Sequence, residues 1–341
     1  MSISALRDRV RKELLEFSWS QWAQLGLSAH TTRSDRWVVD PETLVLFTAE
    51  VARRDPRLFD EVLDWMSLNG RLLSLQRLRN LTGRFPIDRK LVDAVVAWVG
   101  ESTPSLHWSK AGQHGNSRRA KGVPLFSPDV ASFVGEADPV FSRHGYVRPR
   151  VNRSRKSNEP DVRAPVNLAF QLRLILGPGS RSEIMRILLT AADGPLDAAR
   201  IADEAGFAKR NVNETLTALV GSGVVKARWS GNERVFLAFR DRWSTLLDLG
   251  PSADNMPSFV SWIHLLPILM EVLAWLEREA ETADSEYLIS SRARDLVERI
   301  TLDLEIVGVA VPPSRSYPGA AYLSAFEEPV ESLLAFIGSK S

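Results

Sequence analysis

The 341-residue sequence contains no cysteine, which excludes disulfide bonds, thiolate metal sites and cysteine nucleophiles. It also lacks the signatures of a phosphate-binding loop, a nucleophile elbow and a dinucleotide-binding turn. Five histidines are present, and no two of them have the four-residue spacing of a zinc-binding helix. We therefore expect no metal site, no cofactor and no catalytic residues, and a protein that is not an enzyme.

Long apolar runs are also absent. Residues 5–16 are charged and amphipathic, unlike the apolar core of a signal peptide. The most apolar stretch, residues 259–276, contains His264, Pro267 and Glu271, so we expect a buried helix there rather than a membrane span. These features predict a cytoplasmic protein without membrane contact.

The charges are unevenly distributed along the chain. Residues 251–341 carry 6 Lys/Arg against 14 Asp/Glu, whereas residues 1–250 carry 37 against 28. The stretch "SKAGQHGNSRRAKG" (109–122) has four cations and no anion, and residues 143–163 have seven cations against two acids. This excess is either ordinary surface variation or a surface for an anionic partner.

At this length we expect two or three domains around separate cores. The fold class that the patterns predict is a mainly α, multi-domain protein. Its predicted parts are an N-terminal helical domain (1–100), a basic, loop-rich connector (101–163), a compact segment with a β-hairpin (164–249) and an acidic C-terminal helical domain (250–341). The connector is interpreted either as an arm that lies along phosphates or as a solvated linker.

Two clusters of charged residues stand out in the N-terminal domain, and the first concerns DNA binding. The segment "SLQRLRNLTGR" (74–84) follows two predicted helices, so it is either a second, degenerate helix-turn-helix or an ordinary basic helix. A separate feature is the shared face of Asp60, Glu61 and Asp64 on the preceding helix, which we expect to be a solvated surface rather than a general acid/base pair. The cations of the 74–84 segment are Arg77, Arg79 and Arg84.

The most regular pattern lies at residues 182–239. Ser182 and Asp197 are expected to cap the first two of three helices, and Gly206 to end the second. A turn at 230–232 separates two alternating strands, which is typical of a hairpin. The predicted elements are helices at 182–192, 196–207 and 209–220 and two strands within 224–239.

The third of these helices is amphipathic. Within "GFAKRNVNETLTALVGSGVV" (206–225), the apolar side chains of Val212, Leu216 and Leu219 fall on one face. The opposite face is polar and carries Arg210, Asn213, Glu214 and Thr217.

This order of three helices and a hairpin resembles the winged-helix domains of bacterial transcription regulators of the ArsR and MarR type. The resemblance rests on Ile201, Ala202, Gly206, the Val212–Leu219 stripe and Gly223–Val225. It implies that the third helix enters the major groove of double-stranded DNA and that the hairpin, or wing, contacts the backbone or the minor groove. The residues that it implies in DNA contact are Lys209, Arg210, Asn211, Asn213 and Thr217 on the helix and Arg228, Asn232 and Arg234 on the wing.

Two residues depart from the pattern of that family. Ala208 stands where a Ser or Thr usually caps the third helix, so one capping interaction and one phosphate contact are missing. Glu214 places a carboxylate on the face that would meet DNA, where it repels phosphates unless it accepts a hydrogen bond from cytosine.

The acidic C-terminal domain has a wide apolar helix face that needs cover. Dimerisation would cover it, and so would packing across the N-terminal domain. Because winged-helix regulators usually bind paired half-sites as dimers, we expect a homodimer. The residues of this face are Trp262, Ile263, Leu266, Leu269, Met270, Leu273 and Leu276.

From the sequence we therefore expect a DNA-binding transcription regulator, whose effector or further protein partner stays open. The alternatives are a protein-interaction or antitoxin-like module, whose winged helix contacts a partner protein, and an accessory subunit that holds nucleic acid without sequence choice.

Overall fold

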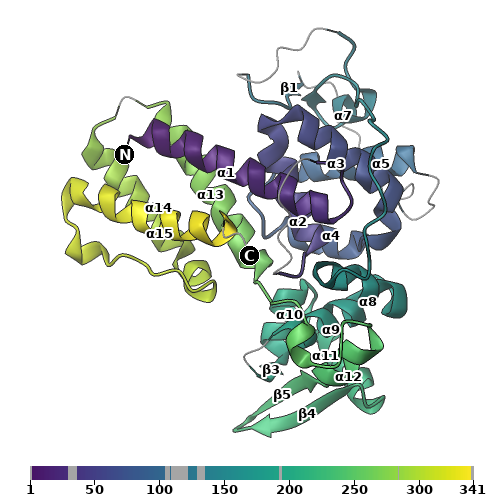
Figure 1. Cartoon of the computed structure of the whole chain (residues 1–341). Helices are drawn as coiled ribbons and strands as arrows, with labels where there is room; N and C mark the ends of the chain where they lie inside the picture. The colour runs from purple at the N-terminus through teal and green to yellow at the C-terminus, as the bar shows by residue number, and fades with distance from the viewer. Residues whose placement is uncertain are drawn as a thin grey trace. The chain divides into compact units, whose positions relative to one another are not determined.

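The computed structural model describes residues 2–29, 37–103, 108, 122–128, 135–191, 194–282 and 284–338 (Figure 1). The chain is mainly helical and contains a small three-stranded antiparallel sheet, which confirms the predicted fold class. Contacts between Cα atoms divide it into two compact units. The first unit combines Met1–Trp19 with Ser261–Ser341, and the second unit is Ser20–Val260. No helix among the described residues is long and apolar enough to cross a membrane.

This division differs from the four predicted parts of the chain. The first 19 residues belong with the acidic C-terminal helices, and the remaining N-terminal helices share a unit with the connector and the hairpin segment. The physical reason lies in contacts between segments that are far apart in sequence, described below.

The first unit is built from helices α1, α13, α14 and α15, of which α1 continues into the second unit. The apolar face of α13 is buried here: Phe17 of α1 lies 5.7 Å from Trp262, and Phe326 of α15 lies 4.8 Å from Trp275, between ring centroids. The chain therefore covers this face itself. Of the two covers expected from the sequence, packing against N-terminal residues is the one that the structure contains, through α1. The bounds are α1 (Ile3–Gln24), α13 (Trp262–Ala280), α14 (Glu286–Ile306), η6 (Ser314–Ser316), η7 (Gly319–Ala321) and α15 (Tyr322–Gly338).

The second unit begins with a group of helices around a tryptophan-containing core. Trp22 and Trp65 pack edge to face at 5.0 Å, and both are buried. Asp40 and Asp55 cap two of the helices by accepting hydrogen bonds from backbone N–H groups, each just before a proline. The bounds are α2 (Pro41–Val51), η1 (Ala52–Arg54), α3 (Pro56–Asn69), η2 (Gly70–Leu72), α4 (Leu75–Thr82) and α5 (Arg89–Ser102).

The described part of the connector lies against α3. Arg153 Nε is 2.8 Å from Asp64 Oδ1, and Ser154 Oγ donates to Glu61 Oε2 at 2.6 Å. Arg148 forms an ion pair with Asp60. The bounds here are β1 (Val123–Pro124), α7 (Pro139–Arg143), β2 (Tyr146–Val147), which pairs in parallel with β1, and η4 (Pro165–Asn167).

These contacts correct two expectations. The α3 carboxylates are not merely solvated, because connector cations pair with Asp60 and Asp64 and the hydroxyl of Ser154 donates to Glu61. For the same reason, these connector cations are engaged within the protein and do not form a free arm for phosphates. Residues 109–121, which hold the other basic stretch, lie outside the described residues.

The last part of the second unit contains the three predicted helices and the hairpin. We call residues 180–238 the helix–hairpin module. The sheet has the order β3-β5-β4, and all three strands run antiparallel to their neighbours. The bounds are α8 (Leu168–Leu176), α9 (Ser180–Thr190), β3 (Leu196–Asp197), α10 (Ala198–Ala205), α11 (Lys209–Gly221), β4 (Val225–Ser230), β5 (Glu233–Ala238), α12 (Arg240–Leu246) and η5 (Ala253–Asn255).

The predicted helix ends in the module are confirmed with one exception. Asp197 accepts hydrogen bonds from two backbone N–H groups at 2.7 and 2.9 Å, and Gly206 adopts a left-handed φ of 69°. Ser182 is not the N-cap of α9, because the helix begins at Ser180. Ser182 Oγ instead accepts from the backbone N–H of Gly179 at 3.3 Å, from inside the first turn.

Candidate nucleic-acid interface

Helix α11 presents a polar face to solvent. Its apolar stripe of Val212, Leu216 and Leu219 is buried in the core of the module, which fixes the direction of the opposite face. Asn211 is half-buried, and its Oδ1 accepts from Thr215 Oγ1 at 3.4 Å. The exposed predicted contacts on α11 are Lys209, Arg210, Asn213 and Thr217.

The carboxylate of Glu214 is paired on this face. Arg210 Nε lies 3.0 Å from Glu214 Oε1, one helical turn away, and the two side chains are 91% and 68% exposed. An exposed pair of this kind contributes little to stability. The guanidinium of Arg210 can therefore exchange Glu214 for another anion at small cost.

The N-terminus of α11 has no side-chain cap, because Ala208 precedes it. The first backbone N–H groups of the helix consequently have no side-chain acceptor at this end. Together with Lys209 and Arg210 they make the end of α11 positively polarised.

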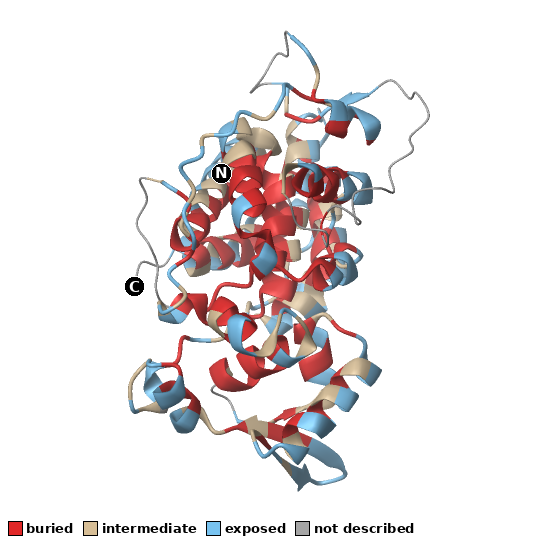
Figure 2. Ribbon diagram, turned by 90° about the vertical axis from the view of Figure 1, so that its right-hand side faces the viewer, coloured by how far each residue is buried: buried red, intermediate tan, exposed pale blue. Residues whose placement is uncertain are grey.

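The hairpin extends beyond the helices of the module, and its outer end is exposed (Figures 1 and 2). Gly231 forms the turn with φ 60°. The guanidinium of Arg234 lies 5.4 Å from the ring centroid of Phe236. The predicted wing residues Arg228, Asn232 and Arg234 are all exposed.

The exposed charges of α11 and the hairpin are mainly positive. Cations on these two elements outnumber carboxylates, and Glu233 is the carboxylate of the hairpin. In the parts of the chain that the structure describes, Arg210 alone among these cations has a carboxylate partner. The cations are Lys209, Arg210, Lys226, Arg228 and Arg234.

Sequence reasoning missed one hairpin residue, Trp229, which is 72% exposed. It follows Val225 and Ala227 on the side of β4 that packs against the helices, so its alternation predicts burial. It is exposed because the hairpin continues past the edge of the core.

Helix α4 lies on the turn that joins α10 to α11. Asn80 Nδ2 donates to the carbonyl of Gly206 at 3.1 Å, and Arg84 Nη1 donates to the carbonyl of Asp203 at 2.9 Å. A Cβ atom on Gly206 would lie 2.6 Å from a methyl group of Leu81. The N-terminal helices therefore hold the turn that orients α11.

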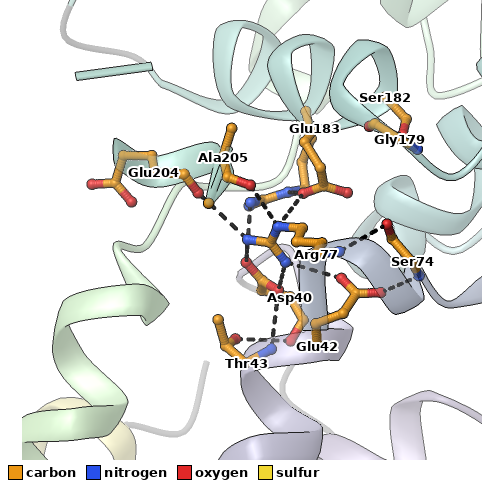
Figure 3. A network of polar contacts seen from close by, with 12 residues as sticks. Asp40, Glu42, Thr43, Ser74, Arg77, Gly179, Ser182, Glu183, Glu204 and Ala205 are labelled. Atoms are coloured by element: carbon orange, nitrogen blue, oxygen red, sulfur yellow. Dashed lines mark hydrogen bonds and ion pairs between the residues drawn. The ribbon is translucent and has the colours of Figure 1, made fainter. Parts of the chain in front are cut away.

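The same contacts correct the hypothesis of a second helix-turn-helix. Arg77 is fully buried, and its Nε donates to the carbonyl of Ala205 at 2.7 Å (Figure 3). Arg84 faces Asp203 in addition to its carbonyl. These two arginines bind α10 and are not presented to DNA.

Arg77 also belongs to a buried ionic network. Its guanidinium lies between the carboxylates of Asp40 and Glu42, with Nη2 2.7 Å from Asp40 Oδ2 (Figure 3). Arg173 Nη2 on α8 lies 2.6 Å from both Glu42 Oε2 and Glu183 Oε1. Three guanidinium groups thus face three carboxylates, and all six side chains are buried. The members are Asp40, Glu42, Arg77, Arg173, Glu183 and Arg186.

The network keeps the carboxylates of Asp40 and Glu183 ionised. Burial by itself raises the pKa of Asp40, but Arg77 and Arg186 outweigh it, and the pKa lies below the ordinary value. Burial likewise opposes ionisation of Glu183, and Arg173 and Arg77 hold its pKa well below the usual range. Buried ion pairs therefore join the residues at α2 and α4 to those of α8 and α9.

These pKa shifts predict how the penalty of Asp40→Asn depends on pH. A lowered folded-state pKa stabilises the fold above the unfolded pKa of about 4 and loses that effect as the pH falls. The loss of unfolding free energy in Asp40→Asn should thus be constant between pH 5 and 8 and shrink below about pH 4. Denaturant unfolding of both proteins across this range measures it, and a penalty that shrinks between pH 7 and 5 would contradict the assignment.

His144 does not disturb this comparison. Its pKa is lowered, chiefly by burial, and the charges that act on it are outside the network, so its titration contributes equally to both proteins and cancels in their difference.

Comparisons of the chain with protein-family models, curated proteins and solved structures found no match. Among the described residues, no group of three or more His, Cys, Asp or Glu side chains is placed to hold a metal ion.

Proposed function

We propose that this protein is a cytoplasmic, DNA-binding transcription regulator and that the helix–hairpin module is a winged helix. In this proposal α11 lies in the major groove of double-stranded DNA and the hairpin lies along the adjacent backbone. The observation that carries the proposal is the exposed polar face of α11, with Lys209 and Arg210 at the end that would enter the groove. The major groove is wide enough for a helix and presents a distinct pattern of donors and acceptors for each base pair.

The chemistry of the exposed residues supports two kinds of contact. Arg and Lys donate to guanine acceptors or to phosphates. The side-chain amide of Asn213 can donate to N7 of adenine and accept from its N6 amino group. Arg228 and Arg234 on the hairpin can neutralise phosphates. Regulators of this kind usually bind two half-sites about 34 Å apart, so we propose that two copies act together.

The buried network supports a role for the N-terminal helices in this function. Helix α4 donates hydrogen bonds to the end of α10 and to the turn before α11. A change in the N-terminal helices would then reach α11 directly.

Binding to DNA fragments from the gene's own upstream region tests the proposal. Each neutralised phosphate contributes about −0.9 to the slope of log K against log [salt]. Five exposed cations on α11 and the hairpin predict a slope of about −3 to −5 per copy. Fluorescence anisotropy between 50 and 200 mM salt measures it. Absence of binding at low salt overturns the proposal, and a co-purifying protein in that case supports the protein-interaction alternative.

A further inference from the structure

Trp229 is a large apolar side chain in an unusual place. It stands on β4, near the hairpin turn, with 72% of its surface exposed. Its cross-strand partner is Arg234, so both side chains leave the same face of the hairpin. Among the described residues, no aromatic ring packs on the indole.

The face that carries Trp229 is the one that packs against the helices of the module. Val225 and Ala227 precede it on that face and contact the core, and Phe236 lies opposite Ala227. Trp229 therefore points to the side of the hairpin on which α9 and α11 lie, but beyond their cover. Trp is enriched at interfaces because its ring is apolar and its N–H can bind a polar partner, and Trp229 stands beside the proposed binding helix.

The charges around Trp229 indicate which partner. Arg234, its cross-strand partner, shares its face of the hairpin, and Arg228, its chain neighbour, leaves the opposite face, so one cation lies on each side of the hairpin. Glu233 is the single carboxylate on the described hairpin. The contact of Arg234 with Phe236 holds one cation beside the indole. Cations that flank an exposed aromatic ring are typical of nucleic-acid surfaces, where the cations bind phosphates and the ring packs on bases or sugars.

We propose that Trp229 packs into the minor groove of the duplex that α11 binds, with Arg228 and Arg234 on the flanking phosphates. This inference rests on the proposed function and adds an apolar, shape-dependent contact to it. Because an indole releases no counterions, Trp229 contributes to affinity without contributing to its salt dependence.

The test compares Trp229→Ala, Trp229→Phe and Arg228→Ala in the full-length protein on the same duplex. We expect Trp229→Ala to lower affinity about tenfold with an unchanged salt slope, and Trp229→Phe to retain most of the affinity. Arg228→Ala should reduce the slope by about 1. Tyr287→Ala, which removes another exposed aromatic ring at 65% exposure, is the control and should change neither quantity.

A second measurement separates this contact from a structural effect. Trimming the duplex so that it ends before the flanking minor groove should weaken the wild type about tenfold more than it weakens Trp229→Ala, because both proteins lose the arginine contacts and only the wild type loses the indole contact. If Trp229→Ala binds as tightly as the wild type while the wild type binds DNA, this inference fails and the proposed function stands. If Trp229→Ala loses affinity because it no longer dimerises, a second copy occupies the residue and the inference also fails. If the wild type binds no DNA, the proposed function itself fails.

Discussion

Replacement of Arg77 by methionine should destabilise the second unit by about 3–5 kcal/mol, the usual effect of removing one partner from a buried ion pair. The substitution leaves Asp40 and Glu42 without their shared guanidinium and the carbonyl of Ala205 without its donor. Methionine is similar in length and apolar, so the loss reflects uncompensated charge rather than a cavity. Hydrogen exchange of peptides from α4 and α9 measures the effect within this unit.

Arg71→Met is the matched control for this substitution. Arg71 lies in the same unit and also forms an ion pair, with Glu159 at 3.0 Å, but both side chains are more than half exposed. Its replacement should cost less than about 1 kcal/mol. If Arg77→Met proves too unstable to purify, the double variant Arg77→Met with Asp40→Asn restores part of the charge balance and should recover part of the stability. Equal effects of Arg77→Met and Arg71→Met would contradict the role of the network.

The double substitution Lys209→Ala with Arg210→Ala should weaken binding to double-stranded DNA about 100-fold. Each contact of a cation with a base or phosphate contributes about 1–3 kcal/mol, and 1.4 kcal/mol corresponds to tenfold in affinity. Removal of Arg210 also leaves the carboxylate of Glu214 without its partner, so that Glu214 repels phosphates more strongly. Both replaced side chains are exposed, so the fold should be unaffected, and circular dichroism checks this.

The control removes two exposed cations from other helices. Lys12 and Arg299 each pair with a carboxylate on the surface, and their joint replacement by alanine changes the net charge by the same amount. This control should bind DNA as the wild type does. Equal losses in the two double variants would indicate binding by overall charge alone and would contradict a specific role for α11.

The elements of the helix–hairpin module could be predicted because their signals are local. The spacing of Val212, Leu216 and Leu219 predicts which face of α11 is buried, and Asp197 and Gly206 mark the ends of α10. Helix periodicity, caps and turn residues act within a few residues of the chain. Helix α9 begins two residues before the predicted start. Ser182 binds the backbone N–H of Gly179 from within the first turn and not from the N-cap position.

The buried network could not be predicted, because its members are far apart in the sequence. Glu42 and Arg173 are separated by 131 residues, and nothing near either of them indicates the other. The same holds for the connector: Arg153 and Asp64 are 89 residues apart, and each by itself is typical of a solvated surface. Charged residues in such patterns predict exposure, and only the fold reveals that they neutralise one another.

Periodicity left open what covers the apolar residues. The face of α13 was compatible with a second copy or with packing against N-terminal residues, and α1, α14 and α15 cover it. Trp229 drew no prediction from the sequence, and it is exposed because the core ends before it. Periodicity predicts which residues share a face and does not predict what lies opposite that face. Homodimerisation therefore stays a prediction, now without the support of the α13 face.

Selection of DNA from a pool of random duplexes tests the proposed sequence-specific binding by α11. The wild type and the Lys209→Ala, Arg210→Ala double variant are incubated with the same pool, and the bound DNA is sequenced. We expect the wild type to enrich a common sequence motif and the double variant not to enrich it. A wild type that enriches no motif, or a double variant that enriches the same motif equally well, would contradict the proposal.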